Sequence, residues 1–175
     1  PPRSTLFPYT TLFRSEGKSI RFSLAAVKNV GEAAIRNMIR DREDNGPFKS
    51  YGDFLRRLSE GDLNRKMVES LIRASALDCF AIPRSHLIAV LEPFSNQIAN
   101  SRRQNMDGQL SLFEMGAMPE SVDSEPDYPR LAEFSHAELL GMEKEMLGLY
   151  VTGHPLDEYE TAIKRFCSLD SSSFV

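Results

Sequence analysis

A glycine at position 31 is followed by backbone groups that could bind a phosphate. The stretch "VKNVGEAAIRNMI" places Gly31 directly before a predicted helix that begins at Glu32. Glycine has no Cβ, so a ligand can approach its backbone, and the first N–H groups of a helix lack partners within it. With the positive end of the helix dipole they suit a phosphate oxygen, and such contacts carry no base information. The candidate contacts here are Lys28, Asn29, Val30, Gly31, Glu32, Ala33 and Arg36.

A second candidate site stands at the start of a later helix. In "LNRKMVESLIRASALD", Asn64 is a good N-cap residue, and Arg65 and Lys66 follow it in the first turn. Residues 18–73 hold 12 Lys and Arg against 8 Asp and Glu, a balance that suits a polyanion. Residues 106–160 hold 2 Lys and Arg against 13 Asp and Glu. A polyanion would repel this half, so it must face a different partner.

The pentapeptide Gln109-Leu110-Ser111-Leu112-Phe113 places apolar residues where no helix or strand pattern exists. Its surroundings have the composition of a linker, with prolines and repeated acids. An extended peptide can bury Leu112 and Phe113 in a partner's cleft, with Gln109 at the rim and Leu110 in a shallower contact. Alternatively, Leu112 and Phe113 pack on the helices of this same chain.

Helices are needed to position these groups, and the apolar spacing predicts them on both sides of Gly31. After an extended lead-in at "SIRFSL", Leu24 and Val27 mark a short helix, and a longer one runs from Glu32 to a stop at Gly46-Pro47. Two helices joined by a tight glycine turn resemble the helix-hairpin-helix pattern. A plain corner between two helices is the alternative for this segment alone.

A second pair of helices follows at once. Ser50 and Asp53 resemble a capping box at the start of one helix, and Asn64 opens the next. Two such pairs in succession are a stronger indication of duplex binding than either alone. Their predicted inward positions are Phe54, Leu55, Leu58, Met67, Val68, Leu71 and Ile72.

At this point a family resemblance becomes specific. The stretch from "IRFSL" to "ASALD", and then "RSHLIAVLE", "GQLSLF" and "EKEMLGLYVTGHPLDEYE", resembles the alpha subunit of bacterial DNA polymerase III, the C-family replicative polymerases, over about residues 16–166. The resemblance implies a tandem helix-hairpin-helix domain that holds double-stranded DNA behind the active site. It also implies that residues 109–113 dock on the sliding clamp (the beta subunit), and that the protein is cytoplasmic, at the bacterial nucleoid, with other replisome subunits as partners.

The same resemblance implies that the parent chain is a DNA-directed DNA polymerase, a nucleotidyltransferase that uses Mg²⁺. The family's catalytic aspartates lie upstream, and no segment here matches their motifs, so we expect no catalytic residue and no cofactor in this fragment. Two other classes stay open: the helix-hairpin-helix part of a DNA repair enzyme (nuclease, glycosylase or ligase), and a helical module that binds only proteins.

The expected fold is mainly α: a tandem helix-hairpin-helix domain at 16–80, a connecting helix at 81–106, a partly disordered acidic linker at 107–134, and an α-rich segment at 135–175 that leads toward a missing OB-fold. The connecting helix is expected to be bent or interrupted at Pro93.

The last segment has its own local signals. Ser135 and Glu138 form a predicted capping box, Glu143 interrupts the apolar face of that helix, and Gly148 ends it. "LYVTGHP" is expected to be strand-like, and Pro155 to open a last helix.

Other candidate chemistry finds little support. The two cysteines (Cys79 and Cys167) and three histidines show no metal-ligand spacing, so we expect free thiols and no metal site. His154 beside Asp157 could suggest catalysis, but without a nucleophile nearby a buried turn histidine is the favoured interpretation. No apolar run reaches the length of a membrane span.

Residues 1–15, "PPRSTLFPYTTLFRS", resemble translated sequencing-adapter read-through, with "TLF" repeated and three prolines. We therefore set them aside as a probable non-native artefact. The alternative is a short genuine β-ribbon.

Overall fold

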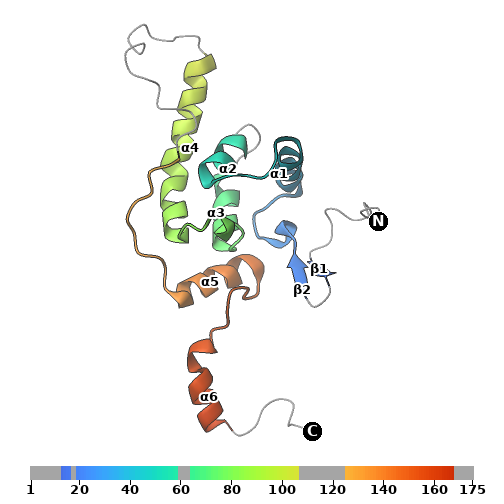
Figure 1. The fold of residues 1–175 in the computed structure, drawn as a ribbon, viewed down its shortest axis with the longest axis vertical. Coiled ribbons are helices and arrows are strands. Elements are labelled where there is room, and N and C mark those ends of the chain that lie inside the picture. The colour runs from blue at the N-terminus through green and yellow to red at the C-terminus, as the bar shows by residue number, and fades with distance from the viewer. Residues whose placement is uncertain (1–12, 17–18, 59–63, 107–124, 168–175) are drawn as a thin grey trace.

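The computed structural model describes residues 13–16, 19–58, 64–106 and 125–167. The elements in these ranges are mostly helical, so the predicted mainly α fold is confirmed. In Figure 1, α1 to α4 gather into one body, α5 lies across its lower end, and α6 projects away from it. The helices are α1 (Glu32–Asn45), α2 (Tyr51–Leu58), α3 (Arg65–Arg73), α4 (Arg84–Met106), α5 (His136–Leu147) and α6 (Glu160–Phe166). None of the helices in these ranges is long and apolar enough to cross a membrane.

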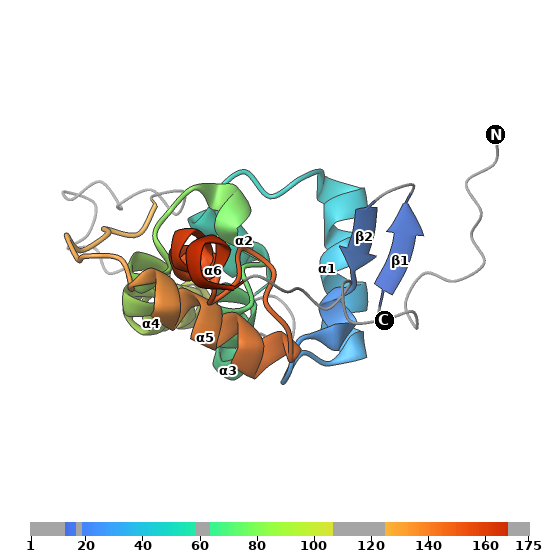
Figure 2. The ribbon, with the colours of Figure 1, turned by 90° about the horizontal axis from the view of Figure 1, so that it is seen from below.

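A β-hairpin precedes the helices on the α1 side of the molecule (Figure 2). β1 (Phe13–Glu16) pairs antiparallel with β2 (Ser19–Phe22), with Phe13 opposite Phe22. The extended lead-in predicted around Ile20 and Phe22 is therefore confirmed. The structure also places residues 13–15 in a strand, as the β-ribbon alternative requires, although these residues were set aside from the fold. The non-native origin of residues 1–15 stays a prediction.

The first predicted hairpin forms where the apolar spacing places it. The 3-10 turn η1 (Leu24–Ala26) stands before the turn and α1 after it, with Ile35 and Met38 of α1 buried. α1 ends at Gly46, whose φ of 81° lies in the left-handed region that favours glycine. The predicted stop at Gly46-Pro47 is confirmed.

The second pair, α2 and α3, also begins at the predicted residues. The Ser50 hydroxyl accepts the N–H of Asp53 at 3.1 Å, as in a capping box. The Asp53 carboxylate accepts the N–H of Lys49 at 2.9 Å, one residue earlier than the standard motif. Asn64 caps α3 by accepting the N–H of Lys66 at 2.9 Å. All seven positions predicted to face inward are buried: Phe54, Leu55, Leu58, Met67, Val68, Leu71 and Ile72.

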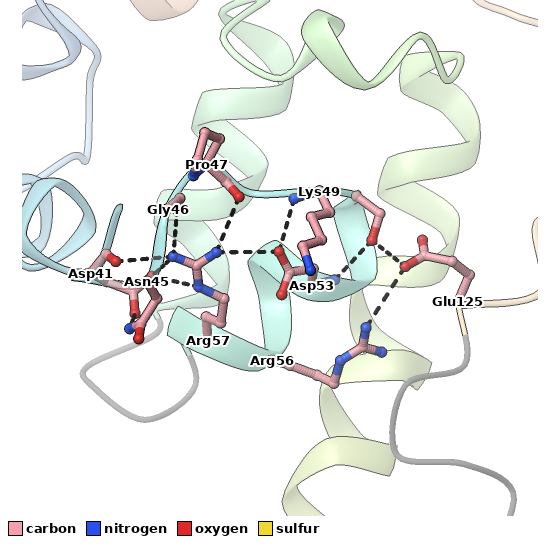
Figure 3. A network of polar contacts seen from close by, with 10 residues as sticks. Asp41, Asn45, Gly46, Pro47, Lys49, Asp53, Arg56, Arg57 and Glu125 are labelled. Atoms are coloured by element: carbon pink, nitrogen blue, oxygen red, sulfur yellow. Dashed lines mark hydrogen bonds and ion pairs between the residues drawn. The ribbon is translucent and has the colours of Figure 1, made fainter. Parts of the chain in front are cut away.

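Arg57 joins the first hairpin to the second (Figure 3). Its guanidinium donates to the Asp41 carboxylate at 2.7 Å, to the Asp41 carbonyl at 3.0 Å and to the Gly46 carbonyl at 2.9 Å. It also pairs with Asp53 at 3.3 Å and lies 4.3 Å from the centre of the Phe48 ring. Because Asp41 and Gly46 belong to the end of α1 and Asp53 to α2, this one side chain ties the two hairpins together.

α4 shares the core with α2 and α3, so it does more than connect two units. Tyr51, Val68, Ile72 and Leu87 are completely buried, and the Tyr51 hydroxyl donates to the Leu87 carbonyl at 3.2 Å. The helix predicted at 81–106 is confirmed, and it runs through Pro93 without interruption. Its second half extends beyond the body in Figure 1.

Residues 125–134, which we call the acidic strap, were predicted to belong to the linker, but they lie on the helical body. The Glu125 carboxylate accepts the Gly52 N–H at 3.2 Å and also binds the Ser50 hydroxyl, at the N-terminus of α2 (Figure 3). Glu133 accepts the first two N–H groups of α4, at 2.6 and 3.0 Å. A carboxylate suits such a site because it satisfies free N–H groups and faces the positive end of the helix dipole.

α5 completes the same body. Its capping box of Ser135 and Glu138 is confirmed, and it ends at Gly148, which has the left-handed conformation. Glu143 is completely buried and forms an ion pair with Arg84 of α4 at 3.0 Å. Met146 joins the main core, so the C-terminal segment is packed onto the hairpins at this helix.

The segment after α5 differs from its prediction. "LYVTGHP" forms no strand; instead the N–H groups of Val151 and Thr152 donate to Glu143 at 2.9 and 3.0 Å. His154 is exposed, and its Nδ1 accepts the N–H of Leu156 at 3.2 Å, so it is a turn histidine but the predicted burial is wrong. A 3-10 turn at Asp157–Tyr159 leads into α6, later than the predicted start at Pro155.

Candidate nucleic-acid interface

The turn between η1 and α1 is open at Gly31. A Cβ built on Gly31 would have no heavy atom within 4 Å, so a ligand can approach this backbone, as the sequence predicts. The reversal of the chain, however, is made by Asn29, whose φ is 65°, whereas Gly31 is extended with φ −78°. Asparagine enters the left-handed region more readily than most residues. Gly31 therefore leaves the backbone open to a ligand, and Asn29 makes the turn of the chain.

The N-terminus of α1 is left without a cap. No side chain of residue 31 can bond it, and among the described residues no hydrogen bond engages the N–H groups of Glu32 and Ala33. In three other helices a side chain accepts an N–H group at the N-terminus: Glu125 in α2, Asn64 in α3 and Glu133 in α4. The free N–H groups and dipole of α1 are therefore available to an anion.

The residues around this open helix end differ in how available they are to a phosphate. Lys28 is exposed, and in the described part of the chain its ammonium group has no hydrogen bond or ion pair. Arg36 forms an ion pair with Glu32, and both side chains are about half exposed, so the pair is weak in water. The side chain of Val30 is buried in the core, which leaves only its backbone for a ligand.

The structure brings this turn against the second predicted site. The Asn29 Nδ2 donates to the Ser70 hydroxyl of α3 at 3.1 Å, and that hydroxyl donates to the Lys66 carbonyl at 2.9 Å. Lys66 is exposed in the first turn of α3, and its ammonium group is unpaired among the described residues. The open end of α1 and Lys66 therefore belong to adjoining elements, as a common phosphate-binding face requires.

Arg65 is less available than its neighbour. Its guanidinium pairs with Glu92 of α4 at 2.8 Å, so a phosphate would have to displace that carboxylate. Asn64 uses its side chain as the cap of α3. Residues 59–63, the turn of the second hairpin, lie outside the described ranges.

Acidic residues of α5 limit the face on one side. The Lys28 N–H donates to the Met146 carbonyl at the end of α5, at 3.0 Å. Arg73 pairs with Glu69 at 2.9 Å and with Glu145 of α5 at 3.3 Å. Arg73 is therefore neutralised by two carboxylates, whereas Lys28 and Lys66 are not.

Sequence reasoning missed several of these polar residues. Ser70 is 3% exposed in the middle of an apolar stripe, and a lone serine at such a position is the signal that could have marked it. Arg57 and Glu125 gave no comparable signal, because the contacts of Arg57 with Asp41 and of Glu125 with Ser50 join different elements of the chain.

The other predictions from the sequence concern the two cysteines, the absence of a metal site and the pentapeptide. Cys79 and Cys167 are free, as predicted, and both are exposed. Within the described ranges, no group of three or more His, Cys, Asp or Glu side chains could hold a metal ion. The pentapeptide at 109–113 lies outside these ranges, between the end of α4 and Glu125.

Comparison with known proteins agrees with this geometry. A family model described as "Helix-hairpin-helix motif" matches residues 9–87, which contain η1 and helices α1 to α3. By its fold and the matched motif, the chain contains a helix-hairpin-helix domain.

Relatives named DNA polymerase III subunit alpha identify the family more closely. The chain is 44% identical over 147 residues to the protein of Thermus aquaticus, which is 84% of this chain and 11% of the relative. It is 39% identical over 148 residues to that of Deinococcus radiodurans (85% and 11%) and 35% identical over 158 residues to that of Borreliella burgdorferi (90% and 14%). The chain belongs to the DNA polymerase III alpha subunit family, and it spans 11–14% of the length of these relatives.

Proposed function

We propose that this chain holds duplex DNA by its phosphate backbone, without sequence preference. The observation that carries the proposal is the uncapped N-terminus of α1, which lies beside Lys28 and is joined through Asn29 and Ser70 to the first turn of α3. Helix N–H groups and lysines bind phosphate oxygens and read no base edge. The helix-hairpin-helix match supports the same role.

The relatives suggest the larger setting. We propose that the parent protein is a bacterial, cytoplasmic DNA-directed DNA polymerase that transfers nucleotides with Mg²⁺ during DNA replication. In this proposal the present segment supplies no catalytic residue and no metal ligand, and keeps the duplex attached while chemistry takes place elsewhere.

A second attachment is proposed at residues 109–113, as a docking peptide for the sliding clamp. Leu112 and Phe113 would each gain roughly 1.5–3 kcal/mol on full burial in an apolar cleft. The described residues on either side belong to α4 and to the anchored strap, so the peptide is tethered at both ends to the duplex-binding body. Such tethering raises its effective concentration at a clamp on the same DNA.

A gel-shift titration with primed duplex DNA, with and without a bacterial sliding clamp, tests both attachments. We expect weak binding that falls steeply with salt, with a log–log slope of about −2 to −4 if a few phosphates are neutralised. Adding clamp loaded on the DNA should produce a slower complex and a higher apparent affinity.

The same titration distinguishes the other classes. A helical module that binds only proteins would show no shift with DNA at any salt concentration. A repair enzyme would cleave or deglycosylate the DNA, or prefer a damaged duplex over an intact one. Binding that is insensitive to salt or restricted to one sequence would contradict the phosphate-backbone proposal.

A further inference from the structure

Asn29 combines a left-handed backbone conformation with a side-chain bond to a distant helix. Its backbone has a φ of 65°, which makes the reversal between η1 and α1. Its side chain does not face the solvent alone, because Nδ2 donates to the Ser70 hydroxyl of α3 at 3.1 Å, across 41 residues of sequence. The residue therefore shapes the first hairpin turn and bonds it to the second hairpin.

The bond continues into the first turn of α3. Ser70 is 3% exposed, and its hydroxyl donates to the Lys66 carbonyl at 2.9 Å while it accepts from Asn29. A hydroxyl that donates and accepts at once is held in one orientation. Asn29, Ser70 and Lys66 thus form a short polar bridge between two elements that each carry a candidate phosphate contact.

No second polar contact duplicates this bridge within the described ranges. The backbone hydrogen bonds of the turn run from Val27 to Leu24 at 3.1 Å, from Val30 to Val27 at 3.2 Å, from Lys28 to Met146 at 3.0 Å and from Ile35 to Gly31 at 3.2 Å. None of them reaches α3. Val27 and Val30 pack in the core, but apolar packing gives little directional control. The amide of Asn29 is therefore the contact that fixes the direction of the turn relative to α3.

We propose that Asn29 is a positioning residue that sets the spacing between the phosphate site at the N-terminus of α1 and the one at Lys66, so that one duplex engages both. The inference rests on the proposed duplex grip and assigns Asn29 an indirect role, in place of the direct phosphate contact expected from the sequence. Two contacts held at a fixed spacing bind together, because the second one is already in place when the first forms.

The test uses the full 175-residue chain and three variants that remove the bridge: Asn29→Gly, Ser70→Ala and the double variant. Glycine retains the left-handed conformation of residue 29, so Asn29→Gly deletes the amide without straining the turn. Asn37→Ala is the matched control, because Asn37 is an exposed asparagine of α1 whose side chain has no hydrogen bond among the described residues. Affinity for a labelled duplex is measured by fluorescence anisotropy at several salt concentrations, together with the melting temperature.

Each single variant should bind duplex about three- to tenfold more weakly, as expected for one lost hydrogen bond. The salt dependence should also become shallower by about one phosphate, a change that simple loss of stability at a temperature well below melting does not produce. The double variant should be no weaker than the weaker single variant, since both changes remove the same bond. Asn37→Ala should match the unaltered chain.

Three outcomes overturn the inference: wild-type affinity and salt slope in both single variants, additive losses in the double variant, or a lower melting temperature with unchanged binding. In each of these cases the unaltered chain still binds duplex, so the proposed grip survives. If the unaltered chain itself does not bind duplex, the grip is refuted, and the role of Asn29 falls with it.

Discussion

Individual polar side chains hold separate elements of this molecule together. Arg57 joins α1 to α2, Glu125 returns from far along the sequence to the N-terminus of α2, and Asn29 joins the first turn to α3. Each of these contacts uses the fixed geometry of a planar polar group. Conservative substitutions should therefore be costly at these positions and harmless at exposed positions of the same residue type.

Arg57→Lys should destabilise the chain by about 2–3 kcal/mol, because lysine retains the charge but cannot donate to Asp41, Gly46 and Asp53 together. Its stacking on Phe48 would also be lost. Urea unfolding monitored by circular dichroism measures the loss. Arg42→Lys is the control, since Arg42 is exposed and has no hydrogen bond or ion pair among the described residues. Equal unfolding midpoints for the two variants would show that Arg57 acts only through its charge.

Gly52→Ala should also destabilise the chain, by about 1–2 kcal/mol, because the new Cβ would displace a helix-capping carboxylate. That Cβ would lie 2.6 Å from Oε1 of Glu125. Gly141→Ala, on α5 with nothing within 4 Å, should instead stabilise by about 0.5–1 kcal/mol. The double variant Gly52→Ala/Glu125→Ala should lose only slightly more than Glu125→Ala alone, because only the 3.1 Å approach to Cδ of Pro126 remains. A loss equal to the sum of both would show that Gly52 has another role.

Lys66→Gln should weaken duplex binding more than Arg65→Gln does, although the two cations are neighbours. Lys66 is unpaired among the described residues, whereas Arg65 is held by Glu92 at 2.8 Å. We expect the log–log salt slope to decrease by about 0.9 for Lys66→Gln, the value for one phosphate, and by much less for Arg65→Gln. Anisotropy titrations across a range of salt measure both slopes. The reverse order would mean that DNA displaces Glu92.

At the scale of elements, the helices differ in whether a side chain of this protein binds the free N–H groups at their N-termini. α2 and α4 receive carboxylates from the acidic strap, and α3 and α5 are capped by their own Asn64 and Ser135. Among the described residues, α1 receives no side-chain cap, and of the other helices only the short α6 also lacks one. The acidic residues of the C-terminal half thus satisfy helix ends inside the protein, and they leave the end that suits an external phosphate exposed.

The docking of α5 should make the stability of the chain sensitive to acid. Burial favours the neutral form of Glu143, but hydrogen bonds from Thr152, Val151 and Arg84 favour the carboxylate and hold its pKa below the ordinary value of 4.5. A carboxyl with a lowered pKa in the folded state contributes stability above its unfolded pKa, and this contribution is lost as the pH falls through the folded pKa. Stability should therefore decrease below about pH 4.5.

Glu143→Gln is the direct test of this dependence, because glutamine cannot titrate. The variant should be less stable at neutral pH by about 1.5–3 kcal/mol, since the buried Arg84 loses one of its two carboxylate partners and keeps only Asp78. Its stability should then fall less between pH 5 and pH 3 than that of the unaltered chain, as followed by urea unfolding at each pH. Glu158→Gln, on an exposed residue, should keep the full decrease. Identical pH profiles for the two variants would exclude Glu143 as a source of the acid sensitivity.

Local patterns predicted the helices well, because apolar spacing, caps and glycine stops act within a few residues. The starts of α2, α3 and α5 and the ends of α1 and α5 follow such signals. The contacts of Glu125, Glu133 and Glu143 could not be found in this way. A carboxylate that caps a distant helix has the same local sequence as one in a solvated linker, so residues 125–134 were assigned to the linker. The strand predicted at "LYVTGHP" does not form for the same reason, since the N–H groups of Val151 and Thr152 donate to Glu143 and not to a neighbouring strand.

For the whole molecule, the charge asymmetry has a different meaning from the one that composition suggests. The acidic half does not simply face away from the basic half. Glu125 of the strap binds α2, and Glu133 of the strap and Glu143 of α5 bind Arg84 of α4. The proposed duplex-binding face and both described ends of the segment that carries residues 109–113 therefore belong to one body. Under the proposed function, DNA and clamp would be held by a single unit, although their contacts remain chemically separate.

That separation gives the last prediction. Replacing Leu112 and Phe113 together by alanine should abolish binding to a bacterial sliding clamp, because these side chains would supply most of the buried apolar area. Melting temperature and duplex affinity should stay nearly unchanged, since the core of the described residues and the proposed phosphate sites are built from other residues. Gln109→Ala should weaken clamp binding less, by roughly the 0.5–1.5 kcal/mol of one hydrogen bond. Surface plasmon resonance with immobilised clamp measures the binding, and calorimetry the stability. Intact clamp binding with a lower melting temperature would mean that Leu112 and Phe113 pack on this protein's own helices.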